Sequence, residues 1–559
     1  MKTKNEKRLS LYEEYQRLYR SSLNVHSEYF TRLEGYMKQY LGTYELDNAK
    51  EPASTVRNIT YEIIESQIDP DIPYPKAESE VFSEIGELCE RSIERLCRAV
   101  RQKLPFEQLN DLDERYTYIY GGSVWYVEWD NRDAVGGGIK IHCLSPLDFI
   151  PEPGVCDIND MKYCFLRFTT TRSELIDRYG QSPEELSLAD CEYRYSEAAS
   201  DEDTVTVVIC LYRDSDGDVC KLVFSGDLIL ADIPKCYTRR IETKDGGELL
   251  ETPTELIEGS MINGEDEGLL AVPYYVPKSF PIVIRQNTRI SPTLFGLSDC
   301  ERIRPEQQAI NKVESRIIKK LLRAGITPVI PEDAAVTLGN SIFGEIIRMR
   351  PGESLDNYGK LDTTPDISQD IKEADRLYDH AKRVLGISDA LQGLDNTQVE
   401  SGFARQLKIN RAASRLETKK RMKYHAYSRL YKMIFEHYLA FSDEPKPLDF
   451  KDAFGNVRKA AFNRYDFIWR DLDGRLCYND AFIFSVDLNS GSEYSREMLW
   501  QRNLSNLESG TLGDIKSPLT LLRYWQSQER AHYPFARENV EYFEALAKEN
   551  QQKDPIYIN

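Results

Sequence analysis

Residues 386–415 read GISDALQGLDNTQVESGFARQLKINRAASR, and this stretch decides how the chain is organised. A heptad-patterned helix runs into it, and a long, basic helical pattern runs out of it. Between the two lies a polar loop with Gly393, Asn396, Gly402 and two glutamines. Glycine and asparagine interrupt helices and favour turns. The sequence therefore predicts two helices joined by a soft loop with little fixed charge.

The pattern after the loop predicts one helix over 402–440. If unbroken, this helix is about 55–60 Å long, at roughly 1.5 Å per residue. In its first three quarters Glu417 is the only acid. Ten cations share that stretch: Arg405, Lys408, Arg411, Arg415, Lys419, Lys420, Arg421, Lys423, Arg429 and Lys432.

Before the loop, two further helices carry apolar seams. The first opens on SDCE, a capping box from Ser298 to Glu301, and contains Pro305, which predicts a kink or a restart. The second opens on Thr364-Pro365, a cap followed by proline. The first seam is Ile303, Ile310, Val313, Ile317 and Leu321; the second is Ile371, Ala374, Tyr378, Ala381 and Leu385. The second seam has the 3, 4, 3, 4 spacing of a and d positions, and a strand-rich insert separates the two helices. We expect an antiparallel pair whose remaining apolar positions pack on the next copy, although a simple hairpin within one chain remains open.

The rest of the chain mixes helices and strands, which predicts an α+β fold. Helices are expected over 8–45, 78–101 and most of 491–559. The alternation of side-chain types over residues 115–129 predicts a strand that bends at Gly121. Residues 161–168 predict another strand, followed by a short helix capped at Thr171. Residues 242–268 hold nine acids against Lys244 alone and are interpreted as an insertion loop or a solvated arm.

Composition limits the class of protein. The 559 residues carry a net charge of −20, which argues against a general nucleic-acid coat. Eleven cysteines without a C-x-x-C pair indicate reduced thiols rather than a disulfide framework or a metal site. The charged first residues are not followed by the apolar region of a signal peptide, and no apolar run approaches the length of a membrane span. We therefore expect a protein made in the cytosol, without membrane contact.

We find no motif for catalysis, a cofactor or a metal. Residues 339–344 have the spacing of a phosphate-binding loop, but Glu345 stands where a lysine is required. The six histidines are scattered along the chain. Asp214, Asp216 and Asp218 lack the spacing of a calcium loop and are interpreted as a solvated turn. The sequence therefore predicts no enzyme and no cofactor.

Three segments, 143–180, 298–319 and 386–408, occur in an order that resembles the portal protein of tailed bacteriophages. The resemblance covers about residues 50–490 and depends on the order of the parts. It implies a non-enzymatic ring of twelve copies in the virion, at one vertex of a capsid assembled in the host cytoplasm. Double-stranded DNA would pass through the ring during packaging and ejection. The implied partners are the terminase large subunit, the major capsid and scaffold proteins, and the neck adaptor proteins.

The same resemblance implies a division of the chain. The parts are a wing (1–290), two stem helices (291–323 and 365–387), a clip (324–364), a tunnel loop (388–401), a long helix returning to the wing (402–490) and a helical crown (491–559). The tunnel loop would present Asp389, Gln392, Gly393, Asn396, Thr397 and Gln398 to DNA. Docking through the clip would use Glu345, Arg348 and Arg350. Ring packing would use the seam residues from Ile310 to Leu321 and from Ile371 to Leu385.

Alternatives remain at this point. The chain could be another neck or connector component, or a non-catalytic DNA-packaging scaffold. The loop could be an ordinary helix connection. The basic residues Arg405, Lys408, Arg411 and Arg415 could face acidic surface of a neighbouring copy, brace DNA, or form a solvated face.

Overall fold

The computed structural model describes most of the chain. The described residues are 4–43, 56–81, 83–132, 137–180, 204–238, 240–242, 249–251, 254–258, 268–290, 292–322, 326–329, 337–341, 344–348, 359–362, 365–387, 402–451, 457–470, 474–487, 493–515, 517–530, 536, 539, 540, 542, 543 and 546. They form two compact units. The larger unit comprises Met1–Glu34, Ile68–Ser298 and Leu416–Asn559, and the smaller comprises Gly35–Gln67 and Asp299–Arg415. No helix in the described part is long and apolar enough to cross a bilayer.

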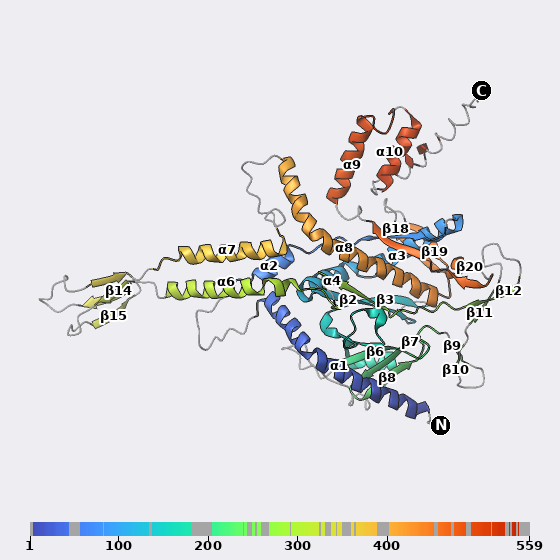
Figure 1. Cartoon of the computed structure of the whole chain (residues 1–559), viewed down its shortest axis with the longest axis horizontal. Coiled ribbons are helices and arrows are strands. Elements are labelled where there is room, and N and C mark those ends of the chain that lie inside the picture. Colours follow the sequence, from blue (N-terminus) through green and yellow to red (C-terminus); the bar gives the residue numbers. More distant parts are fainter. Residues whose placement is uncertain are drawn as a thin grey trace. The chain divides into compact units, whose positions relative to one another are not determined.

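A five-stranded antiparallel sheet forms one layer of the larger unit (Figure 1). Its strands, in order, are β4 (Phe149–Pro151), β5 (Tyr163–Thr171), β6 (Thr204–Arg213), β7 (Val219–Ser225) and β8 (Leu228–Ile233). The N-terminal half of α1 (Lys4–Leu41) lies against this sheet. Tyr12 donates a hydrogen bond to the Gly226 carbonyl at 2.7 Å, and the rings of Tyr15 and Tyr212 are 4.5 Å apart. Aromatic residues spaced three and four apart thus bind the helix to the sheet.

The short helix predicted after β5 is confirmed. It is α5 (Arg172–Tyr179), and the Thr171 hydroxyl accepts the backbone N–H of Glu174, as expected of its N-cap. Gly180 ends the helix with φ of 66°, the left-handed conformation that glycine adopts at little cost.

The expectation of a strand over 115–120 is wrong. These residues end α4 (Phe106–Tyr120), and the strand β2 (Gly122–Asp130) begins only after Gly121. Gly121 has φ of 89°, and a β-carbon there would lie 2.2 Å from the Gly296 carbonyl oxygen. Gly121 is therefore the C-cap of a helix at a close approach to the Gly296 backbone, and not a bend within one strand.

The second predicted helix begins later than residue 78. Residues Tyr74–Ser79 form β1, which pairs with β22 (Phe482–Asp487), and α3 spans Glu84–Lys103. Ser83 caps α3 by accepting the backbone N–H of Gly86. Alternating burial along β1 explains the strand: Ala77 is buried while its neighbours Lys76 and Glu78 are exposed.

A single helix over the long basic pattern is confirmed as α8 (Gly402–Phe441). Its C-terminal half supplies the centre of the larger unit's core, with Tyr427, Leu430, Tyr431, Ile434, Phe435 and Leu439 fully buried. Around it lie β2, β3 (Gly138–Leu144) and β13 (Ile282–Gln286), in the order β13-β2-β3. The remaining elements of this unit are β9 (Arg240–Glu242), β10 (Leu249–Glu251), β11 (Thr254–Glu258), β12 (Leu269–Pro273), β18 (Lys446–Lys451), β19 (Val457–Phe462), β20 (Ile468–Arg470), β21 (Leu476–Tyr478), α9 (Glu493–Glu508) and α10 (Pro518–Arg530).

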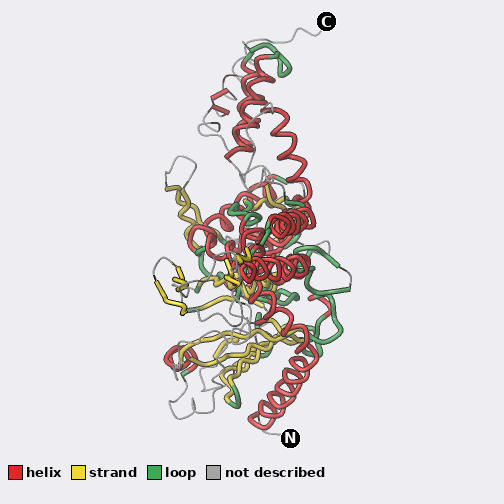
Figure 2. Tube along the Cα trace, turned by 90° about the vertical axis from the view of Figure 1, so that its left-hand side faces the viewer, coloured by secondary structure: helices red, strands yellow, loops and turns green. Residues whose placement is uncertain are grey.

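The smaller unit is built on α6 (Asp299–Leu322) and α7 (Ser368–Leu385), which lie side by side (Figures 1 and 2). α2 (Ile59–Glu65) completes their core, which contains Ile59, Ile63, Ile303, Ile310, Ala381, Leu385 and Ile387. α6 continues through Pro305 without a restart. The insert forms two ribbons, β14 (Ile326–Val329) with β17 (Gly359–Asp362), and β15 (Thr337–Ser341) with β16 (Gly344–Arg348).

The predicted start of the second seam helix needs correction. α7 begins at Ser368, and its N-cap position is Ile367. Thr364 lies outside the described residues, while Pro365 precedes the helix. The Asp366 carboxylate accepts the backbone N–H of Ser368 at 2.9 Å, so an acid placed two residues before the helix satisfies one of its free N–H groups.

Candidate functional site

The paired helices α6 and α7 use most of their seam within one chain. Seam residues buried in the smaller unit are Ile303, Ile310, Val313, Ile317, Ala374, Ala381 and Leu385. Tyr378 is half-buried, and its hydroxyl donates to the Glu62 carboxylate. Leu321 and Ile371 instead remain 51% and 46% exposed. The seam therefore makes a hairpin and leaves two apolar side chains on its surface.

The two exposed side chains belong to the same end of the helix pair. Asp370, next to Ile371, forms ion pairs with Lys320 and Arg316 of α6. The Arg316 guanidinium lies 2.7 Å from the Asp370 carboxylate. These ion pairs hold the C-terminal turn of α6 beside the N-terminal turn of α7. Cations at a helix C-terminus and an acid at a helix N-terminus also complement the helix dipoles.

Part of the basic pattern on α8 is used inside the larger unit. Lys423 is buried, with its Nζ 3.1 Å from a Glu114 carboxylate oxygen and donating to the Asp69 carbonyl at 3.0 Å. Lys420 lies 3.4 Å from the Asp69 carboxylate, and Lys419 covers the Tyr118 ring at 4.8 Å. The partners of these three cations are therefore groups of the same chain. The basic pattern of the sequence did not predict this.

Lys423 belongs to a buried charge network. Arg285 on β13 binds the carboxylates of Asp113 and Glu114, which neighbour each other on α4. The Trp125 indole donates to Asp113 at 2.9 Å. Burial opposes ionisation of Glu114, but Arg285 and Lys423 outweigh it and lower the pKa of this carboxyl. The network joins α4, β2, β13 and α8 through charges that have partners.

The structure describes the remaining predicted site residues only in part. All six tunnel-loop residues, Asp389, Gln392, Gly393, Asn396, Thr397 and Gln398, fall outside the described residues, as does Arg350. Arg405, Lys408, Arg411 and Arg415 lie on α8, and Glu345 and Arg348 lie on β16, where the description covers the backbone alone. Their roles remain predictions.

The turn that holds Asp214, Asp216 and Asp218 forms ion pairs with a lysine of the same chain. Asp214 accepts the backbone N–H groups of Asp216 and Asp218, both at 2.9 Å. Lys235 lies 3.0 Å from Asp216 and 3.4 Å from Asp218. The three carboxylates come within 4.8 Å of one another, and the lysine balances part of their charge.

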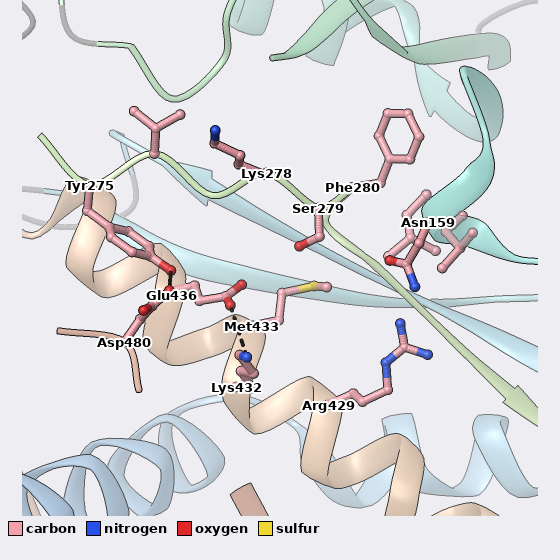
Figure 3. Close-up of a pocket in the computed structure, with 13 residues that line it drawn as sticks. Asn159, Tyr275, Lys278, Ser279, Phe280, Arg429, Lys432, Met433, Glu436 and Asp480 are labelled. Atoms are coloured by element: carbon pink, nitrogen blue, oxygen red, sulfur yellow. Dashed lines mark hydrogen bonds and ion pairs between the residues drawn. The ribbon is translucent and has the colours of Figure 1, made fainter. Parts of the chain in front are cut away.

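A cavity of about 480 Å³ opens beside α8 in the larger unit (Figure 3). Arg429, Lys432, Met433 and Glu436 line it from the helix. The opposite side is lined by Tyr275, Val276, Lys278, Ser279, Phe280, Ile282, Ile158, Asn159 and Asp480. One end is acidic: Glu436 lies 4.0 Å from Lys432, and the Tyr275 hydroxyl donates to Asp480 at 2.9 Å. Burial, reinforced by Asp480, raises the pKa of Glu436 to about 7 despite Lys432.

This cavity predicts a pH dependence of stability. The folded chain keeps the Glu436 proton up to a pH near 7, whereas the unfolded chain releases it near the ordinary value, so stability falls as the pH rises between the two. Glu436→Gln should be about 1–3 kcal/mol more stable than wild type at pH 8, and this difference should largely vanish at about pH 4, below the ordinary pKa of the carboxyl. Denaturant unfolding at both pH values measures this. The exposed Glu444→Gln is the control, and a gain independent of pH would contradict the assignment.

A comparison with protein families finds a match to a family of phage proteins. The family model described as "Phage SU10 portal protein" matches residues 60–465, which include residues of both compact units. No curated protein matches the chain.

Proposed function

The chain belongs to the phage portal protein family, and we propose that twelve copies of it close into a ring through which DNA enters and leaves the capsid. The match over 60–465 carries this proposal because its bounds include the helix pair, its insert, the loop and most of the segment that holds the long helix. Portal proteins are structural and non-catalytic, and they assemble at a vertex of the virion.

In the proposed ring, α6 and α7 form one segment of the channel wall. The hairpin buries its own seam, and the exposed Leu321 and Ile371 meet the helix pair of the next copy. Because each copy contacts two neighbours through different surfaces, such contacts generate a closed ring when the rotation closes. The ribbons between the helices are proposed to dock the terminase large subunit, and later the neck adaptor proteins.

The acidic balance suits a passage for DNA. Binding of duplex DNA depends largely on neutralised phosphates, so a channel lined with many cations would hold the DNA still. A chain with net charge −20 repels it. The polar loop 388–401, with its glutamines, Asn396 and Gly393, is proposed to narrow the channel and to yield as the duplex moves.

Stiffening that loop should reduce packaging without preventing ring assembly. Gly393→Pro restricts the backbone at the loop and removes an N–H, so we expect intact rings and less nuclease-protected DNA per head. Gly393→Ala, which leaves most backbone freedom, is the matched control. The measurement is the amount of protected DNA in heads assembled with each variant. Full heads from the proline variant would refute the role of the loop.

A further inference from the structure

One end of the cavity beside α8 holds polar groups without partners. No other described residue donates to, accepts from or forms an ion pair with the side chains of Arg429, Asn159 or Ser279. Figure 3 shows the Arg429 guanidinium and the Asn159 amide facing each other across the space, while the Ser279 hydroxyl points toward the Glu436 side. A guanidinium and an amide can both donate to one carboxylate. This end of the cavity has the chemistry of a carboxylate site.

The surroundings favour a peptide over nucleic acid. The buried Met433 side chain extends between the Arg429 end and the acidic end (Figure 3). Glu436 and Asp480 already have Lys432 and Tyr275 as partners, which leaves Arg429 as a cation open to a ligand among the described residues that line the cavity. A peptide with an acidic side chain next to an apolar one could bind both Arg429 and the Met433 thioether. A phosphate backbone could bind Arg429 alone.

The same chain presents such a segment on the ribbon β11–β12. Its inner face is anchored, because Ile257 and Val272 join the core and the buried Glu255 binds Arg464 and the Tyr478 hydroxyl. On its outer face Leu256 is 71% exposed and Leu269 is 68% exposed. Four acids, Glu258, Glu265, Asp266 and Glu267, occur between these leucines in the sequence. Large apolar side chains exposed together on one rigid surface are typical of an interaction site.

We propose that the outer face of β11–β12 of one copy docks into the Arg429 cavity of a second copy. A carboxylate from 258–267 binds Arg429, and one of the exposed leucines packs against Met433. Leu256 is exposed within its own chain, so the ribbon does not fill its own cavity. The contact joins two different surfaces, as a ring requires, and in this respect the inference rests on the proposed function.

Photo-crosslinking of the full-length chain tests the contact. Benzoylphenylalanine in place of Leu256 should yield, on illumination, a covalent dimer whose crosslinked peptide contains Arg429 or Met433. Arg429→Glu in the same chain should reduce that dimer at least tenfold. Because Arg429 has no described partner, Arg429→Gln is a second variant that preserves the fold. Arg523→Glu is the matched control, since Arg523 is exposed on α10 and does not line the cavity.

Electron microscopy of the same samples separates the two hypotheses. Rings without the crosslink, or with a crosslink that maps elsewhere, would overturn the docking inference and leave the proposed function standing. The mapped crosslink in a sample without rings would support docking and contradict the ring. Absence of both would overturn both. Loss of retained duplex DNA in Arg429→Glu, without any crosslinked dimer in the parent, would show that the cavity binds DNA instead.

Discussion

Arg285→Met is expected to destabilise the larger unit by about 3–5 kcal/mol, because it leaves the buried Asp113 carboxylate without a cation and Glu114 with Lys423 alone. Arg285 is 1% exposed, and Asp113 and Glu114 are both fully buried. Removing one member of a buried ion pair costs far more than the pair contributes when intact. Among the described residues, Lys423 forms its ion pairs with Glu114 and Asp69 and none with Asp113, so it does not replace Arg285 there.

The control for this variant lies four residues further along the chain. Arg289 is exposed, and Arg289→Met should change stability by no more than about 0.5 kcal/mol. Chemical denaturation followed by tyrosine and tryptophan fluorescence measures both variants. The network also predicts a partial rescue: adding Asp113→Asn should recover part of the loss, because the uncompensated carboxylate is gone while Glu114 keeps Lys423. A loss below 1 kcal/mol for Arg285→Met would contradict the account of the network.

The second large effect concerns the ring. Leu321→Asp combined with Ile371→Asp is expected to reduce the fraction of rings at least tenfold while leaving the single chain folded. Both side chains are exposed in the single chain, so the charges remain hydrated there and cost little. In the proposed ring they would be buried without partners at every interface, at several kcal/mol each.

A matched control separates burial from charge. Lys372 is exposed and adjoins Ile371, so Lys372→Asp changes the charge of the same turn without removing an apolar contact. Size-exclusion chromatography with light scattering measures the assembled fraction, and circular dichroism checks the fold. Rings of normal yield from the double aspartate variant would show that this end of the helix pair does not form the interface.

The seam of α6 and α7 shows why helix pairing was predictable. Apolar residues three and four apart place one stripe on one face, and Ile310 and Ala381 occupy buried positions of that stripe. The same spacing assigns Leu321 and Ile371 to the seam, yet both remain exposed. Periodicity identifies the face of a helix, but it does not state how far along the helix the partner extends.

Helix α4 shows where local pattern failed. Tyr, Thr and Ile over 116–120 favour strands, and their alternation concealed the helix. Burial of Thr117, Tyr118 and Ile119 in the tertiary structure overrides that preference. Gly121 in the left-handed conformation was the available signal, since glycine commonly follows the last turn of a helix.

The buried charges had no comparable signal. Arg285 lies more than 170 positions from Asp113 and Glu114, and Lys423 lies more than 300 from Glu114. Spacing along the sequence carries no information about such pairs. For the same reason the cations of α8 looked like one basic face, although Lys419, Lys420 and Lys423 have partners within the chain.

Electron microscopy of the purified full-length chain is the most direct check on the proposed ring. We predict closed particles of one size, with rotational symmetry and a central hole that admits duplex DNA. Single compact copies, or open chains of copies without a hole, at all concentrations tested would contradict the account.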